Sequence, residues 1–128
     1  MLRFMSSEHV RAMNDRLGSS PEMAQACAAL DRSYTVTYRL SDGPDGADVH
    51  WTVRLTPSEV VFSLETAGDA DVCFVDSYRR MVDAAESARQ GEAVATPAPT
   101  GDPAAVATVA PVFAVAAGVA TLDVEFPR

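Results

Sequence analysis

The stretch that decides the fold is Gly68–Gly91, which reads GDADVCFVDSYRRMVDAAESARQG. Its first four residues are rich in Asp and Gly, which favour tight turns, and the apolar run Val72–Val75 follows them. Asp76 or Ser77 then caps an amphipathic helix that ends at Gly91. The stretch therefore predicts a strand that leads directly into a helix covering a sheet.

Three runs of alternating apolar and polar residues precede this unit and predict three strands. They cover residues 34–40, 49–55 and 60–65, and turn-forming residues separate them. Alternation of this kind indicates an antiparallel meander with one covered face. Two helices are predicted before the first strand, over residues 6–18 and 20–30, because each begins with a capping serine followed by apolar residues at helical spacing.

The residues that follow Gly91 divide into three segments. Two prolines limit residues 94–100 to an edge strand or an extended linker. A helix that is apolar nearly all round begins after Asp102, and Pro111 should kink or end it. Residues 122–126 alternate again and predict a last strand.

Length and composition exclude several classes of protein. The 128 residues suffice for one domain, residues 1–128, with a single core. The formal net charge of −8 disfavours binding to nucleic acid or to an anionic membrane surface. All ten basic residues are Arg, so a Schiff-base lysine and a phosphate-loop lysine are excluded. The first residues lack the apolar core of a signal peptide, and a cytoplasmic protein is expected.

The uncharged segment 104–122 has about the length of a membrane-spanning helix. It is mostly Ala and Val, however, with Pro111 near its centre and acidic residues at both ends, and no cluster of Arg marks a cytoplasmic side. A buried core helix is the better interpretation, and no stable membrane insertion is expected.

The sequence contains no recognisable catalytic or metal-binding motif. Two cysteines, Cys27 and Cys73, both lie in apolar surroundings and are interpreted as buried thiols. His9 and His50 are isolated, although a pairing of Cys73 with His50 across strands is an open alternative. The acidic residues at turns lack the pattern of a calcium loop. We therefore predict neither a metal nor a cofactor, and no catalytic residue.

The order of these elements resembles the sterol carrier protein type two family. The features that carry the resemblance are the start of a strand at 70–74, the helix with Tyr78, Met81 and Val82 on one face, and the sequence Gly101–Pro103 before an apolar helix. The resemblance as a whole extends over residues 4–118. The resemblance implies an α+β fold with about five mainly antiparallel, twisted strands covered by helices, and an apolar cavity between the layers. Proteins of the family and their relatives carry sterols, fatty acids or acyl-CoA.

Two segments depart from the family pattern. Family members commonly have a further short helix after the position of Gly91, where this chain has only the proline-rich residues 92–100. The chain also continues beyond the region of resemblance, through residues 119–128, and this extension would add a strand or pair with a second subunit.

The leading hypothesis is a non-enzymatic carrier of a hydrophobic small molecule, with Tyr78 or His50 as the polar group that orients its head group. The alternative is a closed-core module that forms a homodimer or contacts a partner through residues 115–122. A small cofactor-free biosynthetic enzyme is the third possibility. The residues expected to line the cavity face inward from several elements: Trp51, Phe62, Phe74, Tyr78, Met81, Val109, Val112 and Phe113.

Overall fold

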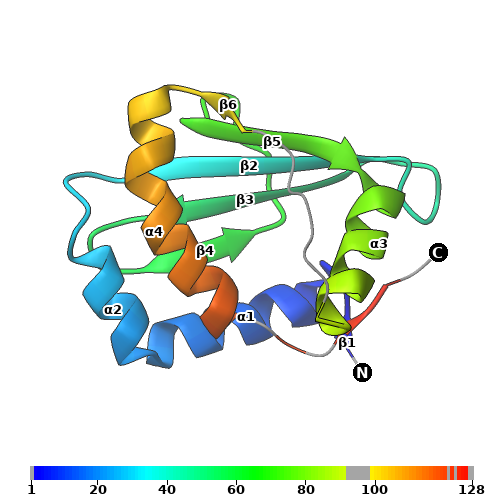
Figure 1. Cartoon of the computed structure of the whole chain (residues 1–128), viewed down its shortest axis with the longest axis horizontal. Coiled ribbons are helices and arrows are strands. Elements are labelled where there is room, and N and C mark those ends of the chain that lie inside the picture. Colours follow the sequence, from blue (N-terminus) through cyan, green and yellow to red (C-terminus); the bar gives the residue numbers. More distant parts are fainter. Residues whose placement is uncertain (1, 92–98, 121, 123, 127–128) are drawn as a thin grey trace.

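The computed structural model, shown in Figure 1, describes residues 2–91, 99–120, 122 and 124–126. A five-stranded sheet forms one layer, and α4 crosses one of its faces, with α1 and α2 on the β4 side and α3 beyond the end of β5 (Figure 1). In chain order the elements are β1 (Leu2–Arg3), α1 (Ser7–Ser19), α2 (Pro21–Cys27), β2 (Tyr34–Ser41), β3 (Val49–Leu55), β4 (Val60–Ser63), β5 (Val72–Ser77), α3 (Tyr78–Arg89), β6 (Thr100–Gly101), α4 (Pro103–Val119) and β7 (Val124–Glu125).

The strands of the large sheet lie in the order β4-β3-β2-β5-β6. β2, β3 and β4 form the predicted antiparallel meander, and β6 is antiparallel to β5. After β4, which is an edge strand, the connection passes β3 and β2, and β5 begins on the far side of β2 from β3. β5 is parallel to β2. This connection covers Thr52, whose hydroxyl donates a 2.6 Å hydrogen bond to the carbonyl of Glu65. The predicted α+β class with a mainly antiparallel sheet is confirmed.

Helix starts follow the capping residues that the sequence indicates. Ser6 caps α1 and Ser20 caps α2, each accepting a hydrogen bond from a backbone amide three residues later. Of the two alternatives before α3, Ser77 is the cap, since its hydroxyl accepts from the amide of Arg80. Asp102 caps α4 through the amide of Ala104. These bonds satisfy amides that have no partner within the helix.

The sequence predicts a kink or an end of the helix at Pro111. The helix does not end there, because α4 continues through Pro111 to Val119. Proline removes one hydrogen-bond donor from the helix interior, and Pro111 itself is exposed. The turns on either side are anchored by Val109, Val112 and Ala116, which are buried. Among the described residues, no helix combines the length and apolarity needed to cross a bilayer.

The two ends of the chain pair with each other. β1 and β7 form a separate two-stranded parallel sheet, and the amide of Phe4 donates a 2.8 Å hydrogen bond to the carbonyl of Glu125. The ring of Phe4 lies 5.1 Å from that of Phe126. The last predicted strand thus has its partner within the same chain. Of the predicted edge segment 94–100, residues 94–98 lie outside the described part, and β6 forms the edge strand next to β5.

Candidate ligand-binding site

Three aromatic rings stack side by side on the face of the sheet that α4 covers. Tyr38 in the middle of β2 lies directly opposite Trp51 of β3 and Phe74 of β5. The ring centroids of Tyr38 and Trp51 are 4.7 Å apart, and those of Tyr38 and Phe74 are also 4.7 Å apart. This spacing equals the distance between neighbouring strands, about 4.8 Å, so strand pairing itself stacks the rings. The result is a flat apolar surface beneath α4.

An apolar pocket of about 280 Å³ lies between this surface and α4. None of the described residues that line it carries a charge. Ala110 and Ala114 of the lining are exposed, so the pocket is open to solvent along α4. Its walls come from β2 and β5, from the residue before β6, and from α4: Val36, Val72, Phe74, Pro99, Val106, Val109, Ala110, Phe113 and Ala114.

Tyr38 brings a hydroxyl group into this apolar layer. Its ring contacts Phe74 and lies 5.9 Å from the ring of Phe113, and both of these residues line the apolar pocket. Burial raises the pKa of Tyr38 well above its usual range. Within the described part of the chain the hydroxyl forms no hydrogen bond. It is therefore a neutral group that can donate to a guest.

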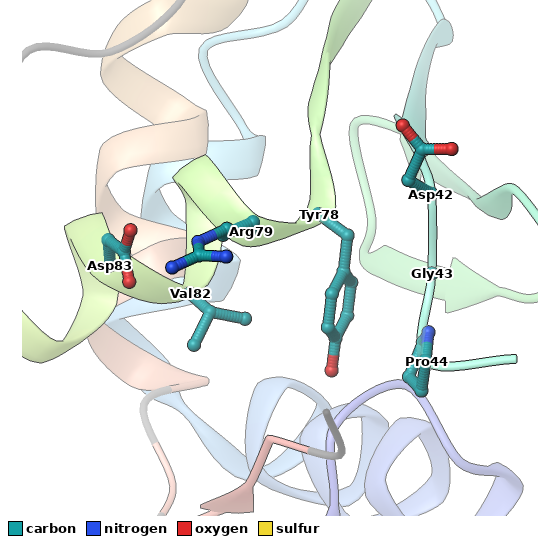
Figure 2. Close-up of a pocket in the computed structure, with 7 residues that line it drawn as sticks. All are labelled: Asp42, Gly43, Pro44, Tyr78, Arg79, Val82 and Asp83. Atoms are coloured by element: carbon teal, nitrogen blue, oxygen red, sulfur yellow. The ribbon is translucent and has the colours of Figure 1, made fainter. Parts of the chain in front are cut away.

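A second pocket, the polar pocket, has a volume of about 270 Å³ and lies between α3 and the turn after β2. Figure 2 shows the ring of Tyr78 between the first turn of α3 and the segment 42–44. Unlike the apolar pocket, it is lined by three charged side chains, Asp42, Arg79 and Asp83. Such a lining suits a polar ligand. A hydrocarbon would bind there poorly, because it would displace water from the charged side chains.

The structure places the predicted cavity residues in four different settings. Phe74, Val109 and Phe113 come together at the apolar pocket, whereas Tyr78 lines the polar pocket. Trp51 belongs to the stacked rings and also meets Phe4 edge to face. The remaining three pack in the core and line neither pocket: Phe62, Met81 and Val112.

Sequence reasoning overlooked several residues of the apolar pocket and the hydroxyl beside it. Val36 and Tyr38 belong to the inward-facing series of the first predicted strand, and that alternation was the signal that could have identified them. The register of β5 against β2 and the rotation of α4 about its axis determine which other residues line the pocket. They were needed to assign Val72, Val106 and Ala110 to it.

Two interpretations of the histidines are corrected. His50 cannot orient a guest in the apolar pocket, because it is exposed and follows the alternation of β3 to the face opposite Trp51. Cys73 and His50 are not neighbours either. Cys73 is paired with Thr37 and His50 with Arg39, so that β2 separates them.

His9 has a structural role. It is 5% exposed, and its Nδ1 accepts a 3.0 Å hydrogen bond from the amide of Met5. Burial lowers the pKa of His9. Met5 itself adopts a left-handed backbone conformation, with φ of 54°. The histidine therefore holds the turn that connects β1 to α1.

The acidic turn residues also have local roles. Asp71 accepts hydrogen bonds from the amide of Thr35 and from Arg32, and these bonds lower the pKa of Asp71. Asp48 pairs with Arg39 at 2.8 Å. Within residues 2–91, 99–120, 122 and 124–126, no three His, Cys, Asp or Glu side chains are grouped so that they could hold a metal ion.

Comparison with solved structures identifies the fold. The chain superimposes on a conserved hypothetical protein from Thermus thermophilus, suggested to be a sterol carrier protein, with a TM-score of 0.65 and 15% identity over 100% of this chain and 94% of that one. For a crystal structure of sterol carrier protein 2 the TM-score is 0.62, with 14% identity over 92% and 97% of the two chains. A UbiJ-SCP2 ubiquinone synthesis protein matches with a TM-score of 0.51 and 18% identity over 84% and 90%.

These likenesses define the architecture as that of sterol carrier protein 2, as the resemblance in the sequence predicted. No family model matches the sequence, and no curated protein matches it.

Proposed function

We propose that this protein binds a hydrophobic small molecule in the apolar pocket and carries it. The observation that supports the proposal most strongly is the uncharged lining of that pocket, between the stacked rings of the sheet and α4. The likeness to sterol carrier protein 2 supports it independently, because the fold is the same. The polar pocket, with its charged lining, does not compete for such a ligand.

Affinity would come from removing hydrocarbon from water. Each buried methylene contributes about 0.8 kcal/mol, so each added carbon should tighten binding about fourfold until the pocket is full. The pocket volume of about 280 Å³ is close to the lower end of the range of about 300–1,000 Å³ for small-molecule sites. A single alkyl chain, or part of a larger apolar body, is therefore the guest that fits.

Binding of an uncharged fluorophore, N-phenylnaphthylamine, followed by displacement with alcohols of increasing chain length, tests this proposal. The Ala110→Phe substitution places a ring in the pocket and should abolish displaceable fluorescence. Ala107→Phe is the matched control, because Ala107 is exposed on the same helix and lines neither the apolar nor the polar pocket. Equal binding by both variants would contradict the assignment of the site.

A role in a biosynthetic pathway is a second candidate, favoured by the likeness to a ubiquinone synthesis protein. Such a role would use the same pocket to hold an apolar intermediate for another enzyme, and it would show as dependence of that enzyme's turnover on this protein. Loss of this dependence in the Ala110→Phe variant, with retention in Ala107→Phe, would link the role to the pocket.

Self-association is a third candidate, favoured by the small residues on the exposed face of α4. Ala104, Ala107 and Gly118 all lie on the outside of this helix. An exposed apolar face of this kind can form an interface, here with a second copy of the chain. Sedimentation equilibrium at high concentration tests this version, and a strictly monomeric protein would rule it out.

A further inference from the structure

We propose that the ligand of the apolar pocket is an uncharged amphiphile, and that the hydroxyl of Tyr38 donates a hydrogen bond to its head group. The proposal rests on the proposed function, since it specifies the ligand of the same site. It assigns an alcohol, ketone, ester or quinone as the head group and disfavours an ionised fatty acid.

The first argument is the position of Tyr38. Its ring is fixed between Trp51 and Phe74, with interplanar angles of 8° and 10°, so its hydroxyl has one defined direction away from the strand. Phe74 and the neighbouring Phe113 both line the apolar pocket, which places Tyr38 directly beside it. Tyr38 is half-buried, and among the described residues no fully buried side-chain polar atom lacks a partner, so water can reach its hydroxyl. Within the described part of the chain this hydroxyl forms no hydrogen bond, and a head group in the pocket can replace the water as its partner.

The second argument is that the other hydroxyl groups on the same faces are already engaged. Tyr34 precedes Val36 on the same face of β2, and its hydroxyl donates a 2.7 Å hydrogen bond to Asp31. On α4, Thr108 donates to the carbonyl of Ala104 at 2.9 Å. Of these three hydroxyls, the one on Tyr38 is left to bind a head group.

The third argument is the distribution of charge. A carboxylate moved from water into an apolar site needs a cation or several donors to compensate for its lost hydration. The described residues that line the apolar pocket include no cation. At the start of β5, next to Val72, the guanidinium of Arg32 lies 3.2 Å from the carboxylate of Asp71 and is thereby neutralised. A neutral head group needs only the one donor that Tyr38 offers.

The test compares dodecanol with dodecanoate as competitors for bound N-phenylnaphthylamine at pH 8, where the acid is ionised. The two ligands have the same chain length and differ in head group. We expect dodecanol to displace the probe at a concentration at least about tenfold lower. Tyr38→Phe should weaken dodecanol binding about fivefold, the effect of one hydrogen bond.

Tyr34→Phe is the matched control, since it removes the other hydroxyl from the same strand face, and it should bind dodecanol as the wild type does. Equal affinity for dodecanol and dodecanoate, or an unchanged dodecanol affinity in Tyr38→Phe, would overturn this inference and leave the carrier function standing. Failure of the wild-type protein to bind the probe or either ligand would instead overturn the proposed function, and the inference with it.

Discussion

The side chain of Asn14 forms two hydrogen bonds with the backbone of Phe62. Its Nδ2 donates to the Phe62 carbonyl at 3.0 Å, and its Oδ1 accepts from the Phe62 amide at 2.7 Å. Phe62 lies on β4, which is an edge strand of the sheet. The amide of Asn14 thus occupies hydrogen-bonding positions that a further strand would use. Protection of this kind limits edge-to-edge pairing between molecules.

Replacing Asn14 with Ala should therefore destabilise the protein and expose the edge. Two partly buried backbone groups lose their partner, which predicts a loss of about 1–3 kcal/mol in the free energy of unfolding, measured by urea denaturation. Asp15→Ala is the matched control, because Asp15 is exposed on the same turn of α1 and its side chain bonds to no described residue. An Asn14→Ala variant as stable as the control would contradict this role of Asn14.

A second prediction concerns the glycine that begins the return from β6 to α4. Gly101 has φ of 135°, and a Cβ added there would overlap the carbonyl oxygen of Asp71, the residue before β5. Gly101→Ala should destabilise the protein by about 1–3 kcal/mol and lower its melting temperature. The cost of a positive φ for alanine and the cost of the clash with the backbone both reduce the free energy of unfolding. Gly68→Ala serves as the control, because it has open space around it and no positive φ. Equal effects of the two substitutions would argue against the β5–β6 pairing.

His9 makes stability depend on pH in a defined direction. Because burial lowers the pKa of His9, the folded state binds fewer protons than the unfolded state below the usual value of 6.5. The contribution of His9 to the free energy of unfolding is therefore fully present above pH 6.5, and it is lost as the pH falls below that value. Protonation also removes the lone pair of Nδ1 that accepts from Met5. Melting temperatures of the wild type between pH 7.5 and pH 5.5 should fall accordingly.

A His9→Gln variant should show a smaller decrease over the same pH range. His50→Gln is the comparison, since it removes the exposed histidine of β3. Parallel melting curves for the wild type and His9→Gln across that range would show that another group causes the pH dependence.

The sequence contained the signals for most of the elements. Period-two alternation identified β2, β3 and β4, and serine or aspartate caps located the starts of the helices. These signals are local, so a single sequence is sufficient to read them. The stretch Gly68–Gly91 folds as predicted, as a strand followed directly by α3.

Relationships between distant residues could not be read in the same way. Nothing near Val72 specifies that β5 lies beside β2, and the stacking of Tyr38 between Trp51 and Phe74 follows from that register. The pairing of β1 with β7 joins opposite ends of the chain and has no local signal. That α4 continues past Pro111 has a related reason, because packing around the helix outweighs the local preference of proline.

The central claim is that a hydrophobic ligand occupies the space between the sheet and α4. The most direct test is an NMR titration with dodecanol, in which valine methyl signals report the site of binding. We predict the largest shifts at Val72, Val106 and Val109, which line the apolar pocket, and small shifts at Val82, which lines the polar pocket. Shifts concentrated at Val82, or no saturable shifts at all, would contradict the account.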